Sequence, residues 1–239
     1  MAATLLEVDG LSKRFGGFTA LNRVTLHVKA GERFGLIGPN GSGKTTLINC
    51  VSGSLPADGG RIRFDGQEIT HLPAHRRTRL GIVRTFQIPK PFVSMTVLEN
   101  LDIPLEYAAQ RRSDEADADA MEILSAIGLE SKAHLRPAGL TQIEMRKLEL
   151  ARAMAARPKL LISDEAMAGL SSAEVDDILA ILFRLSAQGI TIIMIEHIMR
   201  AVMRFSERIV VLDAGERIAE GTPEEIVRNH AVEKAYLGE

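Results

Sequence analysis

Short apolar stretches separated by glycine-rich or charged turns dominate the first 70 residues. Each stretch is rich in branched apolar residues and bounded by turn formers, which is typical of a β-strand. The predicted strands are Leu5–Val8, Val24–Val28, Arg33–Ile37 and Arg61–Phe64. The predicted turns are Gly16-Gly17, Ala30–Glu32 and Asp65-Gly66. Strands joined by such tight turns pair antiparallel, so we expect an antiparallel sheet here.

The pattern becomes helical between residues 97 and 139. Met121, Leu124 and Ile127 recur at the spacing of one helix face, and Gly128 supplies a C-terminal stop. This stretch is therefore expected to bury one side against a core.

A second helical run begins at a capping box. Thr141 and Glu144 have the spacing at which each side chain caps the other's backbone, and the helix is predicted to reach Ala156. Upstream, the two prolines of Ile88–Phe92 interrupt regular structure. We predict that residues 88–155, approximately, form a helical subdomain inserted into an α/β core.

Apolar runs that end in polar residues indicate the strands of that core. The predicted elements are strands at 80–87, 159–165 and 190–196, a helix at 172–188, and a hairpin of 208–212 with 217–220. Because strands alternate with helices, we expect a mainly parallel sheet with right-handed crossovers.

Composition narrows the class of protein. The chain has 239 residues, 46% of them hydrophobic, enough for one large domain or two small ones. A net charge of −2 gives no electrostatic reason to expect nucleic acid as a partner. Cys50 is the only cysteine, which excludes an internal disulfide and predicts a buried thiol. Without a leader or an apolar run of about 18 residues, any membrane link is expected to pass through a partner.

One segment matches G-x-x-x-x-G-K-[ST], the phosphate-binding loop. Its residues are Gly38, Pro39, Asn40, Gly41, Ser42, Gly43, Lys44, Thr45 and Thr46. A predicted strand precedes it and helix-spaced apolar residues follow it, which a chance glycine-rich turn would lack. Lys44 is expected to reach the β- and γ-phosphates, and the Thr45 hydroxyl to bind Mg²⁺. The sequence therefore predicts binding of a nucleoside triphosphate.

Polar residues that end the core strands supply the remaining chemistry. Asp164 is the expected metal ligand, and Glu165 is placed to accept a proton from an attacking water. His197 ends the neighbouring strand, and Gln87 ends the strand at 80–87. Taken singly, these residues are also compatible with an acidic helix start, a structural histidine or a surface amide. Their convergence on one sheet edge favours a site.

In this order the motifs resemble, over nearly the whole chain, the ATP-binding subunits of ATP-binding-cassette (ABC) transporters. The resemblance implies the ABC ATPase fold as a single domain over 1–239, with an α/β P-loop NTPase core, an antiparallel β subdomain and an inserted helical subdomain. The implied roles are Phe15 as the base-stacking aromatic, 38–45 as Walker A, Gln87 as the Q-loop residue near the metal, Asp164 as Walker B, Glu165 as catalytic base and His197 as switch histidine. Without the family, Phe15 before a Gly-Gly turn would be expected to plug the core.

Several segments are similar to importers of branched-chain amino acids. These are Val83–Gln87 with Ile88–Phe92, Ser94–Asn100, Ile195–His197 with Met199–Met203, and Ala235–Glu239. The implied function is ATP hydrolysis that powers uptake of branched-chain or related amino acids. Relatives that import urea, amides or aromatic acids, or extract lipopolysaccharide, stay as alternatives.

The resemblance also implies partners and location. ATP and Mg²⁺ would close two such subunits, and closure would move two transmembrane permease subunits supplied by an extracellular or periplasmic substrate-binding protein. The chain would then be peripheral, at the cytoplasmic face of the inner membrane, with Gln87–Phe92 near the permeases. A soluble cassette ATPase of translation or DNA repair is also disfavoured, because such proteins usually carry two cassettes or a long coiled-coil insertion and 239 residues hold neither. A P-loop kinase is disfavoured by Gln87, Glu165 and His197.

The family signature Leu-Ser-Gly-Gly-Gln is altered here to Leu140–Glu144. Thr141 keeps a hydroxyl that would contact, in trans, the ATP of the partner subunit. Glu144 would repel that ATP unless it turns back to cap its own helix. Ala166 replaces the usual proline after the Walker B acids, and 168–171 lacks its usual aspartate. We therefore hypothesise a heterodimer with one strong and one weak ATP site.

Overall fold

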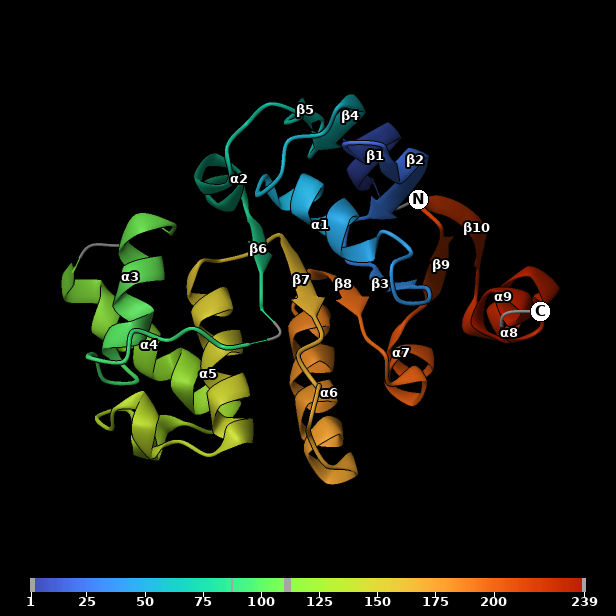
Figure 1. The fold of residues 1–239 in the computed structure, drawn as a ribbon. Helices are drawn as coiled ribbons and strands as arrows, with labels where there is room; N and C mark the ends of the chain where they lie inside the picture. The colour runs from blue at the N-terminus through green and yellow to red at the C-terminus, as the bar shows by residue number, and fades with distance from the viewer. Residues whose placement is uncertain (1–2, 87, 110–112, 238–239) are drawn as a thin grey trace.

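Two sheets organise the fold of this computed structural model, which describes residues 3–86, 88–109 and 113–237 (Figure 1). The smaller sheet is antiparallel and has the order β2-β1-β4-β5. Its strands are β1 (Thr4–Phe15), β2 (Phe18–Lys29), β4 (Gly59–Phe64) and β5 (Gln67–Glu68). The predicted antiparallel sheet is confirmed, and its first two strands extend well beyond the apolar runs that indicated them.

The larger sheet has the order β10-β9-β3-β8-β7-β6. Its strands are β3 (Arg33–Ile37), β6 (Ile82–Arg84), β7 (Leu160–Asp164), β8 (Thr191–Ile195), β9 (Arg208–Asp213) and β10 (Glu216–Gly221). All pairs from β9 to β6 are parallel, and only β10 is antiparallel. The mainly parallel core is confirmed. The strand at 33–37 belongs to this sheet, although the sequence groups it with the antiparallel strands before it.

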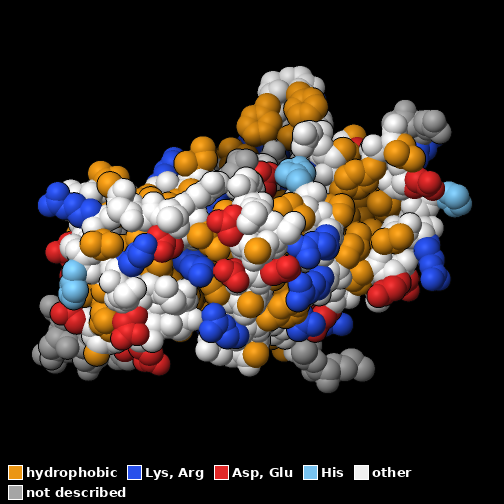
Figure 2. Space-filling model, turned by 90° about the horizontal axis from the view of Figure 1, so that it is seen from below, with side chains coloured by type: hydrophobic (Ala, Val, Ile, Leu, Met, Phe, Trp, Pro, Cys, Tyr) orange, Lys and Arg blue, Asp and Glu red, His pale blue; other side chains and the backbone are white. Residues whose placement is uncertain are grey.

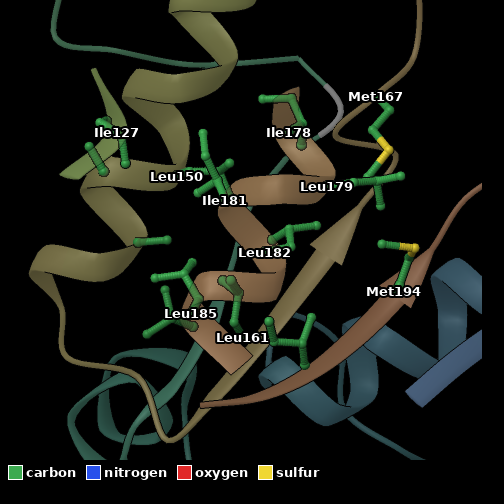
Figure 3. Packing of buried hydrophobic residues seen from close by; sticks show 14 of the residues in the cluster. Ile127, Leu150, Leu161, Met167, Ile178, Leu179, Ile181, Leu182, Leu185 and Met194 are labelled. Atoms are coloured by element: carbon green, nitrogen blue, oxygen red, sulfur yellow. The ribbon is translucent and has the colours of Figure 1, made fainter. Parts of the chain in front are cut away.

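Both faces of the parallel sheet are covered, which explains why its strands are apolar throughout. On one face, alternate residues such as Leu160 and Ile162 pack with helix α1 (Lys44–Ser52) and the antiparallel sheet. On the other face, Leu161 packs against α6 (Ser172–Ala187), as the close view shows (Figure 3). Helix α1 therefore lies between the two sheets (Figure 1). Cys50 is buried on α1, as predicted.

Helices α3 (Glu99–Tyr107), α4 (Ser113–Ile127) and α5 (Gln142–Ala155) pack on one another at one side of the molecule (Figure 1). Leu124 and Ile127 are buried, as the helical stripe predicts, and Gly128 stops α4 with a φ of 74°. The capping box of Thr141 and Glu144 is formed. Short 3-10 turns at 130–132 and 137–139 replace the helix in the rest of the predicted run.

The strand predicted at 80–87 is wrong at both ends, because helix α2 (Ala74–Leu80) occupies Leu80 and is capped by Gly81, and Thr85 and Phe86 lie beyond the strand. The strand covers only Ile82–Arg84, and Gln87 lies outside the described residues. The sequence analysis also missed the short helices α7 (Met199–Phe205), α8 (Pro223–Val227) and α9 (His230–Leu237). Within the described part of the chain, no helix has the length and apolarity needed to cross a bilayer.

Candidate active site

The loop between β3 and α1 is shaped by close backbone contacts. A Cβ on Gly38, whose φ is 151°, would meet the carbonyl oxygen of Leu212 at 2.0 Å. A Cβ on Gly43, at a φ of 102°, would meet the carbonyl oxygen of Ala20 at 2.7 Å. Both positions therefore require glycine. These contacts hold the loop against β9 and β2, so its backbone is set by the two sheets.

Lys44 begins α1 and points into the loop. Its Nζ donates to the carbonyl oxygens of Gly38 (2.7 Å) and Pro39 (2.9 Å). Burial lowers the pKa of the Lys44 amine, while the charges of Glu165 and Asp164 act in the opposite direction. The first turn of α1 carries no acidic residue, so its free N–H groups and its dipole favour an anion. This end of the sheet is therefore built to bind phosphate.

A cavity of about 240 Å³ opens over the loop. It is lined by the loop residues from Asn40 to Thr46, by Phe15 and Phe18 of the β1–β2 hairpin, and by Glu165 and His197. The Phe15 residue is 50% exposed, which overturns the expectation of a core plug. Phe18 pairs with Phe15 across the Gly-Gly turn, a position that alternation within a hairpin could have identified.

Glu165 and His197 meet above the neighbouring strands β7 and β8. Asp164 pairs with Ile195 in the parallel register, so the turns after both strands lie side by side. Glu165 has a φ of 48°, a left-handed conformation that turns the chain sharply away from β7. Its N–H donates to Ile195 at 2.9 Å, and its Oε1 lies 3.0 Å from His197 Nε2. The predicted convergence of these two side chains is therefore present in the structure.

Asp164 forms an ion pair that the sequence analysis missed. Arg84, the last residue of β6, donates from Nη2 (2.5 Å) and Nε (3.2 Å) to Asp164 Oδ2. Arg84 Nη1 also donates to Asn49 Oδ1 on α1 at 2.6 Å. The pairing of β6 with β7 places Arg84 next to the end of β7, a neighbour relation that the sequence pattern does not contain.

A second missed residue, the carboxylate Glu196, contacts the turn at 165–168. It is 2% exposed, and its Oε1 accepts the Met167 N–H at 2.9 Å. Burial, with the Glu165 charge as a further cause, raises the pKa of Glu196 to about 7. From α5, Arg146 Nη2 donates to the Ala168 carbonyl at 3.1 Å. Two buried side chains thus hold the backbone that follows Glu165.

The altered signature is organised as a helix start. Glu144 Oε2 accepts the Thr141 N–H at 2.9 Å, and Glu144 Oε1 lies 2.6 Å from Lys132 Nζ. The Lys132 hydrogen bond, with the capping bond behind it, lowers the pKa of Glu144. The turned-back Glu144 expected from the capping box is therefore confirmed. Thr141 is exposed and does not line the cavity over the phosphate loop.

The donor set fits a magnesium ion shared with a phosphate. Thr45 and Asp164 offer a hydroxyl and a carboxylate, the hard oxygen ligands that Mg²⁺ prefers. Among the described residues no group of three His, Cys, Asp or Glu side chains forms a metal cage. A metal bound mainly by substrate phosphates needs no such cage. Gln87, the other predicted ligand, falls in the part of the chain that is not described.

Comparison with known proteins identifies the family to which the chain belongs. The family model described as ABC transporter matches residues 21–168, more than half of the chain. The fold agrees, because the crystal structure of the ADP conformation of an ATP-binding cassette of an ABC transporter matches with a TM-score of 0.90, at 34% identity and covering 99% of both chains. A dimeric post-hydrolysis cassette bound to ADP and Pi matches with a TM-score of 0.81 at 27% identity, covering 92% of this chain and 99% of that one. The protein is thus an ATP-binding cassette ATPase.

Further relatives identify the family within this class of ATPases. The high-affinity branched-chain amino acid transport ATP-binding protein BraF of Pseudomonas aeruginosa is 42% identical over 254 residues, covering all of both chains. The probable branched-chain amino acid transport ATP-binding protein LivG of Archaeoglobus fulgidus is 40% identical, covering 98% of this chain and 95% of that one. A model of the branched-chain amino acid ATP-binding cassette transporter matches residues 216–239. The chain belongs to the ATP-binding subunits of this branched-chain amino acid family of ABC transporters.

Proposed function

We propose that the chain hydrolyses ATP to power the uptake of branched-chain amino acids through a membrane importer. The observation that carries the proposal is the hydrogen bond between Glu165 and His197, which lies beside an intact phosphate loop in one cavity. The transport of branched-chain amino acids named for BraF and LivG supports the substrate class.

Each residue of the site then has a task. The backbone of 38–46 and Lys44 bind the triphosphate, and Phe15 stacks on the base. Thr45 and Asp164, with Gln87, hold Mg²⁺, which neutralises charge on the β- and γ-phosphates when bound. Glu165 accepts a proton from the attacking water, and His197 orients Glu165 and contacts the γ-phosphate.

The second half of the site comes from another cassette. We propose that Thr141 donates to the partner's ATP, since its hydroxyl is exposed at the start of α5, where it accepts the Glu144 N–H. Glu144 is neutralised by Lys132, which weakens its repulsion of that ATP. Ile143 still limits close approach of the backbone where a glycine is usual. These features support a heterodimer in which this chain's signature covers the weaker site.

A lateral groove of about 570 Å³ is the proposed docking place for a permease subunit. Its lining includes Val83, Arg84, Phe86, Pro104, Tyr107 and Arg152. The exposed rings of Phe86 and Tyr107 offer apolar contact. Arg79 also lines the groove, and its Nε donates to the carbonyl oxygen of Tyr107 at 3.4 Å. An apolar cytoplasmic segment of the permease that carries an acidic residue would match this surface.

Two further proposals are the bounds of the helical subdomain and the location of the protein at the membrane. We propose residues 88–155 as the inserted helical subdomain, which contributes residues of α3 and α5 to the wall of the groove. The protein would be peripheral at the cytoplasmic face of the inner membrane and would meet the substrate-binding protein only through the permeases. On the face seen in Figure 2, basic and acidic side chains are interspersed.

The test starts from a tagged chain used to capture its membrane partners, which are then reconstituted in vesicles with the substrate-binding protein. ATP-driven accumulation of labelled leucine, isoleucine and valine is expected, and Lys44→Ala should abolish it. ATP-driven uptake of urea, amides or aromatic acids instead would overturn the substrate assignment. Failure to capture any hydrophobic membrane protein would overturn the transport role.

A further inference from the structure

Arg84 contacts both the proposed metal ligand Asp164 and an aromatic residue of the lateral groove. Its guanidinium binds Asp164 and Asn49, and the side chains of Arg84 and Asp164 are only 11% and 10% exposed. The same guanidinium lies over the ring of Phe86, with its carbon 5.3 Å from the ring centroid. Arg84 and Phe86 both line the groove.

A cation bound at Asp164 would compete with Arg84 for the carboxylate. Both of its bonds to Asp164 go to the same oxygen, Oδ2, so the pair depends on one acceptor. A divalent cation held by Thr45 and Asp164 would attract that carboxylate and repel the guanidinium, and such forces are strong where water is largely excluded. Loss of the ion pair would free the guanidinium to leave the position that it holds over the Phe86 ring.

We propose that Arg84 is a positioning residue that couples cation loading at Asp164 to the packing of Phe86 in the groove. The inference rests on the proposed function for the metal role of Asp164 and for the occupant of the groove. Coupling of this kind is reciprocal. A permease segment that draws Phe86 and Arg84 toward the groove therefore frees Asp164 for the metal, and metal loading alters the surface that the permease meets.

The absence of tryptophan from the chain permits a direct test. The full chain carrying Phe86→Trp has one indole, next to the Arg84 guanidinium. Mg²⁺ with ATP should move its emission to longer wavelength, because the ring loses its packed guanidinium. ATP with EDTA should give a much smaller shift. ATP affinity is measured separately by calorimetry. A chain that binds no ATP would overturn the proposed function, whereas ATP binding without an indole shift would overturn the coupling alone.

The matched variants are Arg84→Gln and Arg84→Lys, each made in the Phe86→Trp chain. Arg84→Gln should remove the Mg²⁺-dependent shift while changing ATP affinity by less than about threefold. Arg84→Lys keeps the charge without the planar fork and should retain part of the shift. The inference is overturned if the indole does not respond to Mg²⁺ with ATP, or if the response persists unchanged in Arg84→Gln.

Thermal unfolding without nucleotide tests the ion pair independently of ATP binding. Thermal unfolding of Arg84→Gln, Asp164→Asn and the double variant forms a thermodynamic cycle. Because each single change strands a poorly solvated charge, the losses in melting temperature should be less than additive in the double variant. Additive losses would remove the ion pair as the link and overturn the inference.

Discussion

His197 Nε2 lies 3.0 Å from Glu165 Oε1, which joins the turns that follow β8 and β7. The histidine side chain is 48% exposed and that of the glutamate 20%, so the pair stands at the mouth of the cavity. A carboxylate held from one side by an imidazole has fewer orientations available. The contact therefore fixes Glu165 in the direction of the phosphate loop.

Removing the imidazole tests this positioning. His197→Ala should lower the rate of ATP hydrolysis by about 100-fold, the order of loss expected from a misplaced catalytic group. ATP affinity should hold, because the phosphate loop is untouched. Single-turnover hydrolysis and a nucleotide titration separate the two effects. His134→Ala, at an exposed position away from the cavity, is the matched control, and equal rates for the two variants would contradict the role of His197.

The two aromatics of the hairpin differ in their surroundings. Lys13 Nζ lies 5.6 Å from the centroid of the Phe15 ring, whereas Phe18 is the more exposed residue. Phe15→Ala should weaken ATP binding about tenfold, since stacking on a base contributes about 1–3 kcal/mol. Phe18→Ala should have a much smaller effect. Calorimetric titration measures both, and undiminished affinity in Phe15→Ala would remove it as the base platform.

The buried Glu196 predicts a pH-dependent stability. Its pKa is raised from 4.5 to about 7, so the folded state holds its proton more tightly than the unfolded state does. Stability is therefore undiminished below pH 4.5, falls as pH rises toward 7, and stays lower above it by an amount on the order of 3 kcal/mol.

Glu196→Gln keeps an acceptor for the Met167 N–H and removes the titration. Between about pH 5 and pH 8 the melting temperature of the unsubstituted chain should fall relative to that of Glu196→Gln. Scanning calorimetry at several pH values measures the difference. Parallel curves for the two chains would show that Glu196 does not titrate in this range.

The altered signature can be restored in part. Ile143→Gly with Glu144→Gln should raise ATP turnover of the assembled transporter severalfold, because it permits closer backbone approach and removes a carboxylate from the partner's phosphates. Lys132→Ala alone is the control, since it exposes the Glu144 charge and should lower turnover. Unchanged turnover and unchanged ATP-driven dimerisation in the double variant would end the hypothesis of unequal sites.

Much of the architecture follows from local signals. The phosphate loop, the capping box of Thr141 and the stop at Gly128 are encoded within a few residues, and the structure has them where the sequence predicts. The ends of β7 and β8 were also predictable, because apolar runs of a doubly covered sheet stop where polar residues begin. This rule identified Asp164, Glu165 and His197 together.

The missed features depend on contacts between distant segments. Helix α2 has few apolar positions, and its Arg77 is buried because it donates to the carbonyls of Cys50 and Val51 at the end of α1. The Arg84–Asp164 pair depends on strand order, since β6 and β7 are far apart in sequence. Glu196 stays buried through its bond to Met167. A one-dimensional pattern carries none of these relations.

The assignment of Glu165 as the base that activates water is the centre of this account, and one substitution tests it most directly. Glu165→Gln should bind ATP with unchanged affinity while single-turnover hydrolysis falls by at least about 100-fold, the lower end of the contribution of a general base. The bound triphosphate should persist and hold two cassettes in a closed dimer, visible by light scattering. Hydrolysis by Glu165→Gln at the unsubstituted rate would contradict the account.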